Sequence, residues 1–287
     1  MASVLHSGLA YPDPPPEQPV SLWRRIVFLA AVWLLVLTPF LFWHGPWFGR
    51  PLSDQQIDNY LHDSNPQHVR HALMQIGERM SRRDPTVVDW YPDLVALAAS
   101  PYEEVRAADA WVLGQDSTHP EFRPPLHRLL QDASVPVRHS AALSLVQFGD
   151  ASGHEQIVAM LQPVIVAAPK AGRILEIVRP DSLVREGGLV AEMATQSGVL
   201  QIKAPLSGRV HDVRTELGES AAAGAELLTV APNAEQLWNA LRALHDVGRL
   251  GDLPAIEPYL QLSTEFPARV RQQAELTEQA IRQRNVP

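Results

Sequence analysis

The chain contains no cysteine among its 287 residues. This absence excludes disulfide bonds, thiolate metal sites and cysteine nucleophiles. Positive charge is also sparse, because adjacent basic residues occur only at Arg24–Arg25 and Arg82–Arg83, and the formal net charge is −8. Phosphate binding needs a basic face, so the composition predicts that nucleic acid is not a partner.

The common catalytic and cofactor motifs are missing as well. The sequence has no P-loop, nucleophile elbow, zincin helix, EF-hand loop or haem-attachment motif. Among the eleven histidines, His62, His68 and His71 are expected to be ordinary solvated residues beside a helical repeat. Asp109, in an otherwise apolar helical stretch, is expected to bind a neighbouring arginine. We therefore predict a non-enzymatic protein with no cofactor, no metal and no small-molecule substrate.

One long segment lacks charge altogether. Residues 26–43 form an unbroken apolar run, and no charged residue stands between Arg25 and Arg50. A helix of this length spans about 27 Å, close to the roughly 30 Å of a bilayer core. Bulky residues after the run argue against a cleaved signal peptide, and the lack of a polar face argues against a core helix. A transmembrane helix is predicted over residues 24–48, with anchor residues Trp23, Arg24, Arg25, Trp43 and Trp47.

The charges that flank this segment predict its orientation. Arg24 and Arg25 precede it and only Arg50 follows closely, so the positive-inside rule places residues 1–23 in the cytoplasm. For a bacterium, the prediction is a single-pass inner-membrane protein with a periplasmic body. The tail is rich in proline and therefore extended, and it is either a leader without fixed structure or a strap along a partner.

After residue 50 the sequence is helical and repetitive. Three stretches each combine a proline turn, a Val-Arg pair, apolar residues at helical spacing and a closing glycine. The pairs are Val69–Arg70, Val105–Arg106 and Val137–Arg138, spaced 36 and 32 residues apart. This period is typical of stacked helical hairpins, in which proline starts a helix and glycine provides a left-handed end. The pattern resembles the HEAT-repeat family, which implies an armadillo-like solenoid that mostly serves for binding.

From residue 163 short runs rich in Val, Ile and Leu, bounded by Gly and Pro, indicate strands. An Ala-Pro-x-x-Gly motif occurs twice, 36 residues apart; its marker residues are Pro169, Gly172, Pro205 and Gly208. This region resembles the biotinyl-lipoyl domain and its relative in membrane-fusion (periplasmic adaptor) proteins. The resemblance implies a β-domain of the barrel-sandwich hybrid type over residues 163–232.

The attachment lysine of the carriers and the coiled-coil insertion of the adaptors are both absent. Carriers attach their cofactor to a lysine in the central hairpin, but residues 192–198 contain none, so biotin or lipoyl attachment is not expected. Adaptor proteins often insert a helical coiled coil there, and the hairpin is too short for one. A carrier subunit modified at Lys170 or Lys203 remains a third possibility, which intact mass would test.

The sequence thus predicts an α+β multidomain chain with an N-terminal transmembrane helix and a HEAT-like α-solenoid interrupted by a lipoyl-like β-domain. The predicted parts are a tail (1–23), a transmembrane helix (24–48), HEAT-like repeats (53–162), the β-domain (163–232) and further HEAT-like helices with a cap (233–287). The predicted function is that of an accessory or scaffold subunit of a respiratory, photosynthetic or transport complex in the inner membrane. Its predicted partners are integral-membrane subunits and lipid. The alternative is an adaptor-like component of an export system.

Overall fold

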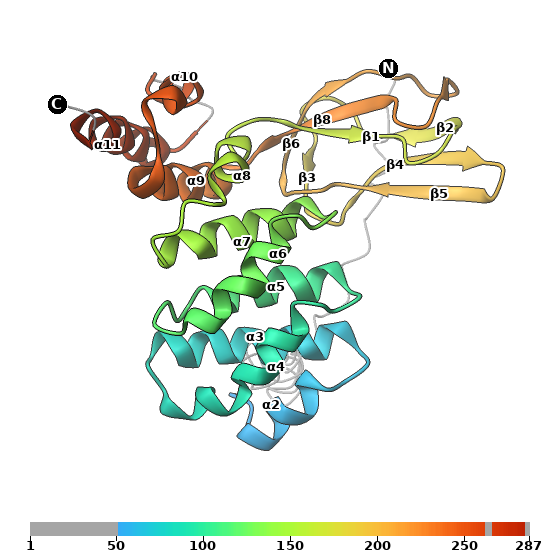
Figure 1. The fold of residues 1–287 in the computed structure, drawn as a ribbon. Helices are drawn as coiled ribbons and strands as arrows, with labels where there is room; N and C mark the ends of the chain where they lie inside the picture. The colour runs from blue at the N-terminus through green and yellow to red at the C-terminus, as the bar shows by residue number, and fades with distance from the viewer. Residues whose placement is uncertain (1–50, 262–265, 285–287) are drawn as a thin grey trace, which may run out of the picture. The chain divides into compact units, whose positions relative to one another are not determined.

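The structure is a computed structural model that describes residues 51–261 and 266–284 (Figure 1). From Leu52 onward the described residues belong to one unit. The helical elements are α2 (Asp54–Leu61), α3 (Pro66–Ser81), η1 (Pro85–Trp90), α4 (Tyr91–Leu97), α5 (Glu103–Leu113), η2 (Pro120–Phe122), α6 (Arg123–Leu129), α7 (Val135–Gln147) and α8 (His154–Ala159) before the strands, and α9 (Ala234–Val247), η3 (Leu250–Asp252), α10 (Leu253–Ile256), η4 (Glu257–Tyr259) and α11 (Ala268–Arg284) after them.

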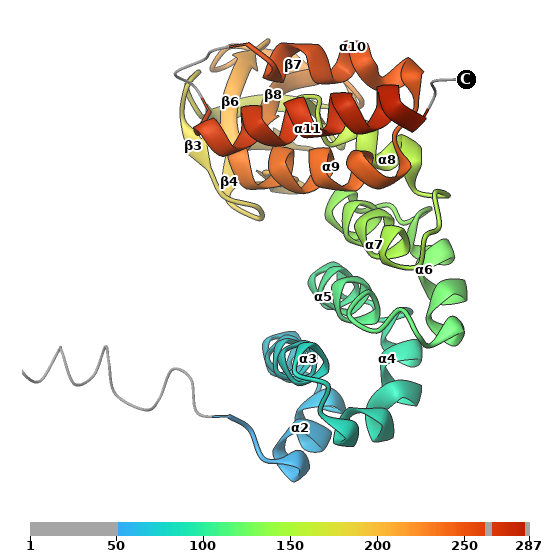
Figure 2. The same ribbon diagram turned by 90° about the vertical axis from the view of Figure 1, so that its left-hand side faces the viewer.

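The helices are arranged in two layers. Figure 2 shows α3, α5 and α7 stacked in one layer, with α4 and α6 in the other. Along the first layer α3 packs on α5, α5 on α7 and α7 on α9, and α9 packs in turn on α11. We call the layer of α3, α5, α7 and α9 the inner layer. This stacking of successive helix pairs is that of a helical solenoid.

Local sequence signals determine several helix starts. At α2 the Ser53 hydroxyl accepts a hydrogen bond from the Gln56 backbone N–H, and the Gln56 side chain accepts one from the Ser53 N–H, forming a capping box. Pro66 and Pro136 stand in the first turns of α3 and α7. A proline there loses no helical hydrogen bond, because the first N–H groups of a helix have no partner within it.

The closing glycines of the repeats differ in their roles. Gly149 has the expected left-handed backbone, with φ +67°, but Gly77 lies inside α3 and Gly114 has a φ of −74°. A methyl group at Gly77 would overlap with the Trp111 ring of α5. The prediction of a left-handed helix end is therefore wrong for Gly77 and Gly114, and at Gly77 the close approach of the next helix explains the glycine.

The strands form two four-stranded antiparallel sheets within the described residues. They are β1 (Val164–Ala167), β2 (Gly172–Ile177), β3 (Leu183–Val184), β4 (Leu189–Thr195), β5 (Gly198–Lys203), β6 (Gly208–Val213), β7 (Ser220–Ala221) and β8 (Glu226–Pro232). One sheet has the order β1-β8-β6-β3 and the other β5-β4-β2-β7. The entering strand β1 pairs with the leaving strand β8, with Val164 opposite Val230, so the chain enters and leaves the sheets side by side.

The helices and the sheets bury separate cores. The helices that precede the strands in the sequence share one apolar core with the helices that follow them. Ile157 and Leu161 belong to this core before the strands, and Leu237 and Leu241 after them. The sheets enclose their own core, which includes Ile174, Met193 and Leu228. The helical array is therefore continuous in space although the strands interrupt it in sequence.

These observations correct the predicted fold class. The described residues form a helical repeat solenoid with two small antiparallel sheets, and none of their helices is long and apolar enough to cross a membrane. The longest of them, α11, has 17 residues and a polar sequence. The predicted transmembrane helix, residues 24–48, and its anchor residues Trp23, Arg24, Arg25, Trp43 and Trp47 lie outside the described residues, as does the tail.

Two further predictions are also corrected. The single-pass inner-membrane location with a periplasmic body finds no support in the described structure, and it is withdrawn. The lipoyl-like family assignment is withdrawn as well, and the region is described by its two small sheets. The β4–β5 hairpin turns at Gln196–Ser197, which offer no amine for cofactor attachment.

Candidate functional site

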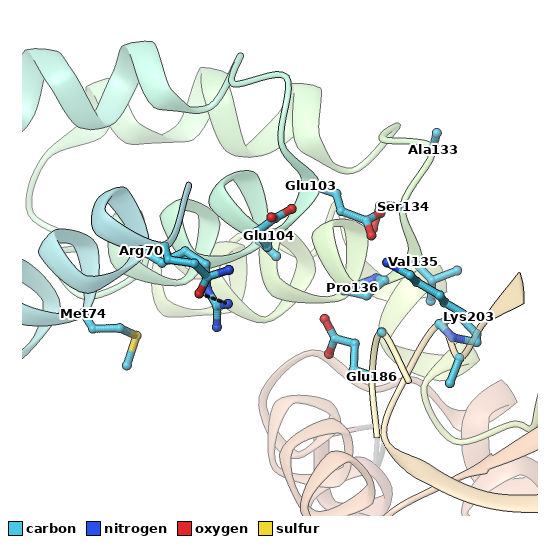
Figure 3. A pocket seen from close by; sticks show the side chains of 16 residues that line it. Arg70, Met74, Glu103, Glu104, Ala133, Ser134, Val135, Pro136, Glu186 and Lys203 are labelled. Atoms are coloured by element: carbon cyan, nitrogen blue, oxygen red, sulfur yellow. Dashed lines mark hydrogen bonds between the residues drawn. The ribbon is translucent and has the colours of Figure 1, made fainter. Parts of the chain in front are cut away.

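An open cleft of about 790 Å³ lies between the inner layer and one end of the sheets (Figure 3). Its lining comes from α3, α5, the start of α7 and two loops of the sheets. The lining residues are Gln67, Arg70, Met74, Glu103, Glu104, Ala107, Ala108, Ala133, Ser134, Val135, Pro136, Glu186, Gly187, Lys203, Ala204 and Pro205.

The helical wall of the cleft combines small and long side chains. The cleft is hollow beside Ala107 and Ala108 of α5, because each of these side chains is only a methyl group. Met74 of α3 lines the same wall and is 52% exposed, although it is a large apolar residue. Flexible methionines adapt to differently shaped partners, so this wall is suited to contact with another molecule.

The β-side of the cleft is made of two loops, at Glu186–Gly187 and Ala204–Pro205, which we call the β-rim. The Gly187 N–H donates to the Ala204 carbonyl at 2.9 Å, and the Ala204 N–H donates to the Gly188 carbonyl at 2.8 Å. The Glu186 N–H donates to the Ser207 hydroxyl at 2.9 Å. These bonds hold Glu186 where Figure 3 shows it, pointing toward the helical wall.

The cleft carries charges that the described residues leave without ion pairs. They are Arg70 and Lys203, which are positive, and Glu103, Glu104 and Glu186, which are negative. Arg70 makes one hydrogen bond, from Nη1 to Gln67 Oε1 at 3.3 Å. Charges without ion pairs in an open cleft are available for contacts with another molecule.

The electrostatic surroundings of Glu186 include charges on the helical wall. Partial removal from water raises the pKa of Glu186, and the negative charge of Glu103 raises it further. The positive charge of Arg70 opposes that shift. A residue of the β-rim therefore responds to charges on both α3 and α5, more than eighty positions earlier in the chain.

The Val-Arg signature has a structural role in the second and third repeats. Val69, Val105 and Val137 are all buried in the helical core. The Arg106 guanidinium binds Asp132 with two hydrogen bonds, at 2.7 and 2.9 Å, and donates to the Ser100 carbonyl. This pair ties the turn before α7 to α5.

The other two signature arginines behave differently from each other. Arg138 donates to the Asp132 and Ala133 carbonyls, at 2.7 and 2.9 Å, and so stabilises the turn before its own helix. Arg70 is exposed and makes neither of these contacts. It is thus the signature arginine that faces the cleft.

A second hollow, of about 430 Å³, lies on the inner layer and is lined by residues of α5, α7 and α9. Trp111 contributes to it and is 39% exposed. Arg242, on α9, also lines it, and its guanidinium lies 5.5 Å from the centre of the Trp238 ring. The inner layer therefore offers an extended surface with aromatic and charged groups.

Of the four marker residues of the duplicated motif, the two glycines begin strands and the two prolines lie in loops. Gly172 begins β2 and Gly208 begins β6, which belong to different sheets. Any side chain at Gly208 would overlap with the Ala231 carbonyl of the paired strand, so only glycine fits there. Pro205 lines the cleft and Pro169 is an exposed loop residue. The motif thus marks the sheet structure, and one of its residues borders the site.

The histidines form no metal centre within the described residues. His68 binds Asp63 through Nδ1 at 2.6 Å and stacks on Tyr60 with ring centroids 4.6 Å apart. His62 lies 3.3 Å from Asp93. Each is accounted for by a local contact.

Asp109 has no arginine partner. It is completely buried in α5, and neither carboxylate oxygen has a hydrogen-bond partner among the described residues. Burial raises the pKa of Asp109 well above its ordinary value. The prediction that it binds a neighbouring arginine is therefore wrong.

Sequence reasoning missed most of the cleft. Met74, Glu103, Glu104 and Glu186 carry no motif, and their proximity depends on the packing of the β-rim beside the helices. One signal was available: Glu103 and Glu104 directly precede the second Val-Arg pair, at a position where the other repeats have no carboxylates.

The comparisons with known proteins concern the helical part. The HEAT-repeat family model, described as HEAT repeats, matches residues 91–164. No curated protein matches the chain. The matched segment contains α4 to α8, so those helices form HEAT-type repeats.

Three solved structures show weak likeness. The complex of CpcE and CpcF of phycocyanin lyase from Nostoc sp. PCC7120 is 16% identical over 83% of this chain and 68% of that chain, with a TM-score of 0.44. A designed armadillo repeat protein in complex with the peptide (KR)4 is 15% identical over 78% of this chain and 80% of that chain, with a TM-score of 0.40. A single-chain, multi-domain long-chain acyl-CoA carboxylase is 19% identical over 31% of this chain, with a TM-score of 0.24, and the matched part is 10% of that protein's length.

Likenesses this weak carry no argument about function. The helices themselves form a helical repeat solenoid, and the HEAT-repeat model matches residues 91–164 of it. Its fold is compatible with an accessory or protein-binding role, because solenoids present extended surfaces. The export-adaptor alternative depended on the inner-membrane location and the lipoyl-like assignment, which are both withdrawn.

Proposed function

We propose that this chain is a protein-binding scaffold rather than an enzyme, and that it holds a segment of a partner protein in the cleft. The observation that carries the proposal is the convergence of α3, α5, α7 and the β-rim on one open cleft. Segments from distant parts of the chain form a single surface there.

The chemistry of the lining supports a macromolecular partner. Sites for small molecules are mostly apolar and nearly enclosed. This cleft is open and combines Met74 with charges of both signs that have no ion-pair partner among the described residues. Such a surface resembles the polar rim and adaptable contacts of a protein interface.

The lining also supports a role without catalysis. Among the described residues, those that line the cleft include no histidine, and the chain has no cysteine. The Ser134 hydroxyl, which also lines the cleft, has no hydrogen-bond partner among the described residues, so it is not paired with a base as covalent catalysis would need.

Site-specific photo-crosslinking tests the proposal in cells that produce the protein. We would replace Met74, inside the cleft, with a photo-crosslinking amino acid, and make the matched control at Arg128, which is exposed on α6 of the other layer. We expect Met74 to crosslink to one partner protein in defined amount, and Arg128 to give little or none of that product.

Two results would contradict the proposal. The first is a Met74 variant that gives no protein adduct while the protein is folded and produced at normal level. The second is equal crosslinking of the same proteins from Met74 and Arg128, which would indicate random encounter instead of a binding cleft.

A further inference from the structure

Strand β5 is the longest open edge of the two sheets. It ends the order β5-β4-β2-β7 and has six residues, whereas the other terminal strands within the described residues have four (β1) or two (β3 and β7). Proteins usually protect such edges with proline, bulges or inward charges. β5 contains no proline, and its single charged residue is Lys203 at the end.

The register of the β4–β5 hairpin shows which backbone groups of β5 face outward. Thr195 pairs with Gly198 across a two-residue turn, and Met193 pairs with Leu200. In β4, Glu192 and Ala194 pair with β2 on the other side. Because hydrogen bonding alternates along an antiparallel pair, the N–H and C=O groups of Val199 and Gln201 point away from β4.

These outward groups are unpaired. No described residue forms a backbone hydrogen bond with the outward groups of Val199 or Gln201. Val199 itself is 63% exposed. Unpaired backbone donors and acceptors in this alternating pattern match an extended polypeptide, the ligand of β-strand addition.

The open edge leads into the cleft. β5 runs from the hairpin turn to Lys203, and Lys203, Ala204 and Pro205 line the cleft. A chain that lies along β5 and continues past Lys203 would therefore meet the helical wall. At that point Glu103, Glu104 and Glu186 present carboxylates without ion-pair partners among the described residues (Figure 3).

We propose that an extended segment of the partner protein adds to the outer edge of β5 as an antiparallel strand and places a basic side chain among the carboxylates of the cleft. This inference rests on the proposed function, because it names how that partner is held. Antiparallel pairing puts the N-terminal end of the segment at the cleft, so the basic residues belong at that end. The unpaired edge supplies affinity through backbone bonds, and the carboxylates select the charge.

A defined peptide makes the proposal testable without knowledge of the partner. The probe is a fluorescent peptide of sequence Arg-Lys-Thr-Val-Thr-Val-Thr-Val, and its affinity for the full chain is measured by fluorescence anisotropy. One control peptide has the same side chains but N-methyl groups on every second residue of the strand, which remove the donors toward β5. A second control replaces Arg-Lys with Glu-Glu.

The protein variants separate the backbone of Gln201 from its side chain. Gln201→Pro removes the outward N–H and leaves the bonds to β4 intact, as proline is tolerated at such edge positions. Gln201→Ala is the matched control, because both variants lose the side-chain bond to Glu192. Circular dichroism establishes that both variants keep the wild-type fold.

We expect Gln201→Pro and the N-methylated peptide each to weaken binding about tenfold, since one or two backbone hydrogen bonds are lost. Gln201→Ala should bind within about twofold of wild type, and the Glu-Glu peptide should bind about tenfold more weakly. Equal binding by Gln201→Pro and Gln201→Ala, or by the two Arg-Lys peptides, would overturn the proposal. So would the absence of saturable binding to wild type at millimolar peptide.

These outcomes are distinct from failure of the proposed function. If Met74 crosslinks to a partner but Gln201→Pro binds that partner normally, the cleft stands and the strand-addition proposal falls. Light scattering on the full chain gives a further check. A dimer that dissociates in Gln201→Pro and not in Gln201→Ala would mean that a second copy occupies the edge, and this result would also overturn the proposal.

Discussion

Replacing Asp109 should stabilise this protein. The side chain is 0% exposed, and its oxygens have no hydrogen-bond partner among the described residues. The equivalent positions of the neighbouring repeats, four residues after Val69 and Val137, hold Leu73 and Ala141, both completely buried. The repeat architecture thus accepts an apolar residue at this position, and Asp109→Ala is the natural test.

The magnitude follows from three contributions. An unpaired buried polar group costs about 1–3 kcal/mol, and this cost disappears in Asp109→Ala. Alanine is a better helix former than aspartate by about 0.5 kcal/mol. The lost packing of the carboxyl group costs about 1 kcal/mol in the opposite direction. Near pH 4, where the carboxyl group is protonated in the folded state, the free energy of unfolding should therefore rise by about 1–2 kcal/mol, and the rise should be larger at neutral pH.

The effect should depend on pH in a defined direction. Burial raises the pKa of Asp109 above its ordinary value of 3.8, so the folded state favours the protonated form. The stability of the wild type is then highest below the ordinary pKa of 3.8, and it falls as the pH rises toward the pKa that Asp109 has in the folded state. The slope of this loss approaches about 1.4 kcal/mol per pH unit. Asp109→Asn, which cannot ionise, should lack this slope.

Urea denaturation of the wild type, Asp109→Ala and Asp109→Asn at pH 4.5, 6 and 7.5 would measure these differences. A difference of about 1 kcal/mol in the free energy of unfolding is the smallest that bears on the prediction. The stability gap between each variant and the wild type should widen as the pH rises. If Asp109→Ala lowers the stability at neutral pH, or if the gap is constant with pH, the carboxyl group has a partner and the reasoning is refuted.

Three further predictions concern the array. Arg106→Ala should lower stability by about 2 kcal/mol in urea denaturation at neutral pH, because it breaks a largely buried pair with Asp132. Since the bond from Arg106 lowers the pKa of Asp132 from 3.8, this difference should shrink as the pH falls below that value, and a difference that does not change with pH would contradict the assignment. Gly77→Ala should displace the Trp111 ring, shift tryptophan fluorescence and lower stability by about 1–2 kcal/mol, whereas an unchanged spectrum would show that the contact is absent. Deletion of residues 163–232 with joined ends should leave a cooperatively melting helical protein, because the two cores are separate, and collapse of its helical circular dichroism would show the sheets to be integral.

The repeats were the part of the fold most accessible from sequence. Val69, Val105 and Val137 are buried because their spacing puts each on the core side of its helix, which a periodic pattern reveals directly. The closing glycines were harder. Position 77 requires glycine because the Trp111 ring of another helix lies against it, and this contact could not be derived from local sequence.

The candidate site was largely inaccessible from sequence. Arg70 and Arg106 share one motif, yet one is exposed at the cleft and the other binds Asp132. Glu186 reaches the same cleft from a loop of the sheets. The partners that decide these roles are far away in the chain, and a motif does not encode them.

The most direct test of the binding cleft is the affinity of the crosslinked partner for two charge-reversed variants. One variant combines Arg70→Glu and Glu104→Lys inside the cleft, and the matched control combines Arg128→Glu of α6 and Glu121→Lys of η2, which are exposed and do not line the cleft. Both leave the net charge unchanged. Isothermal titration calorimetry should show about tenfold or greater weakening for the cleft variant and less than about twofold for the control. Equal affinities for the cleft variant and the wild type would contradict the assignment of the cleft as the binding site.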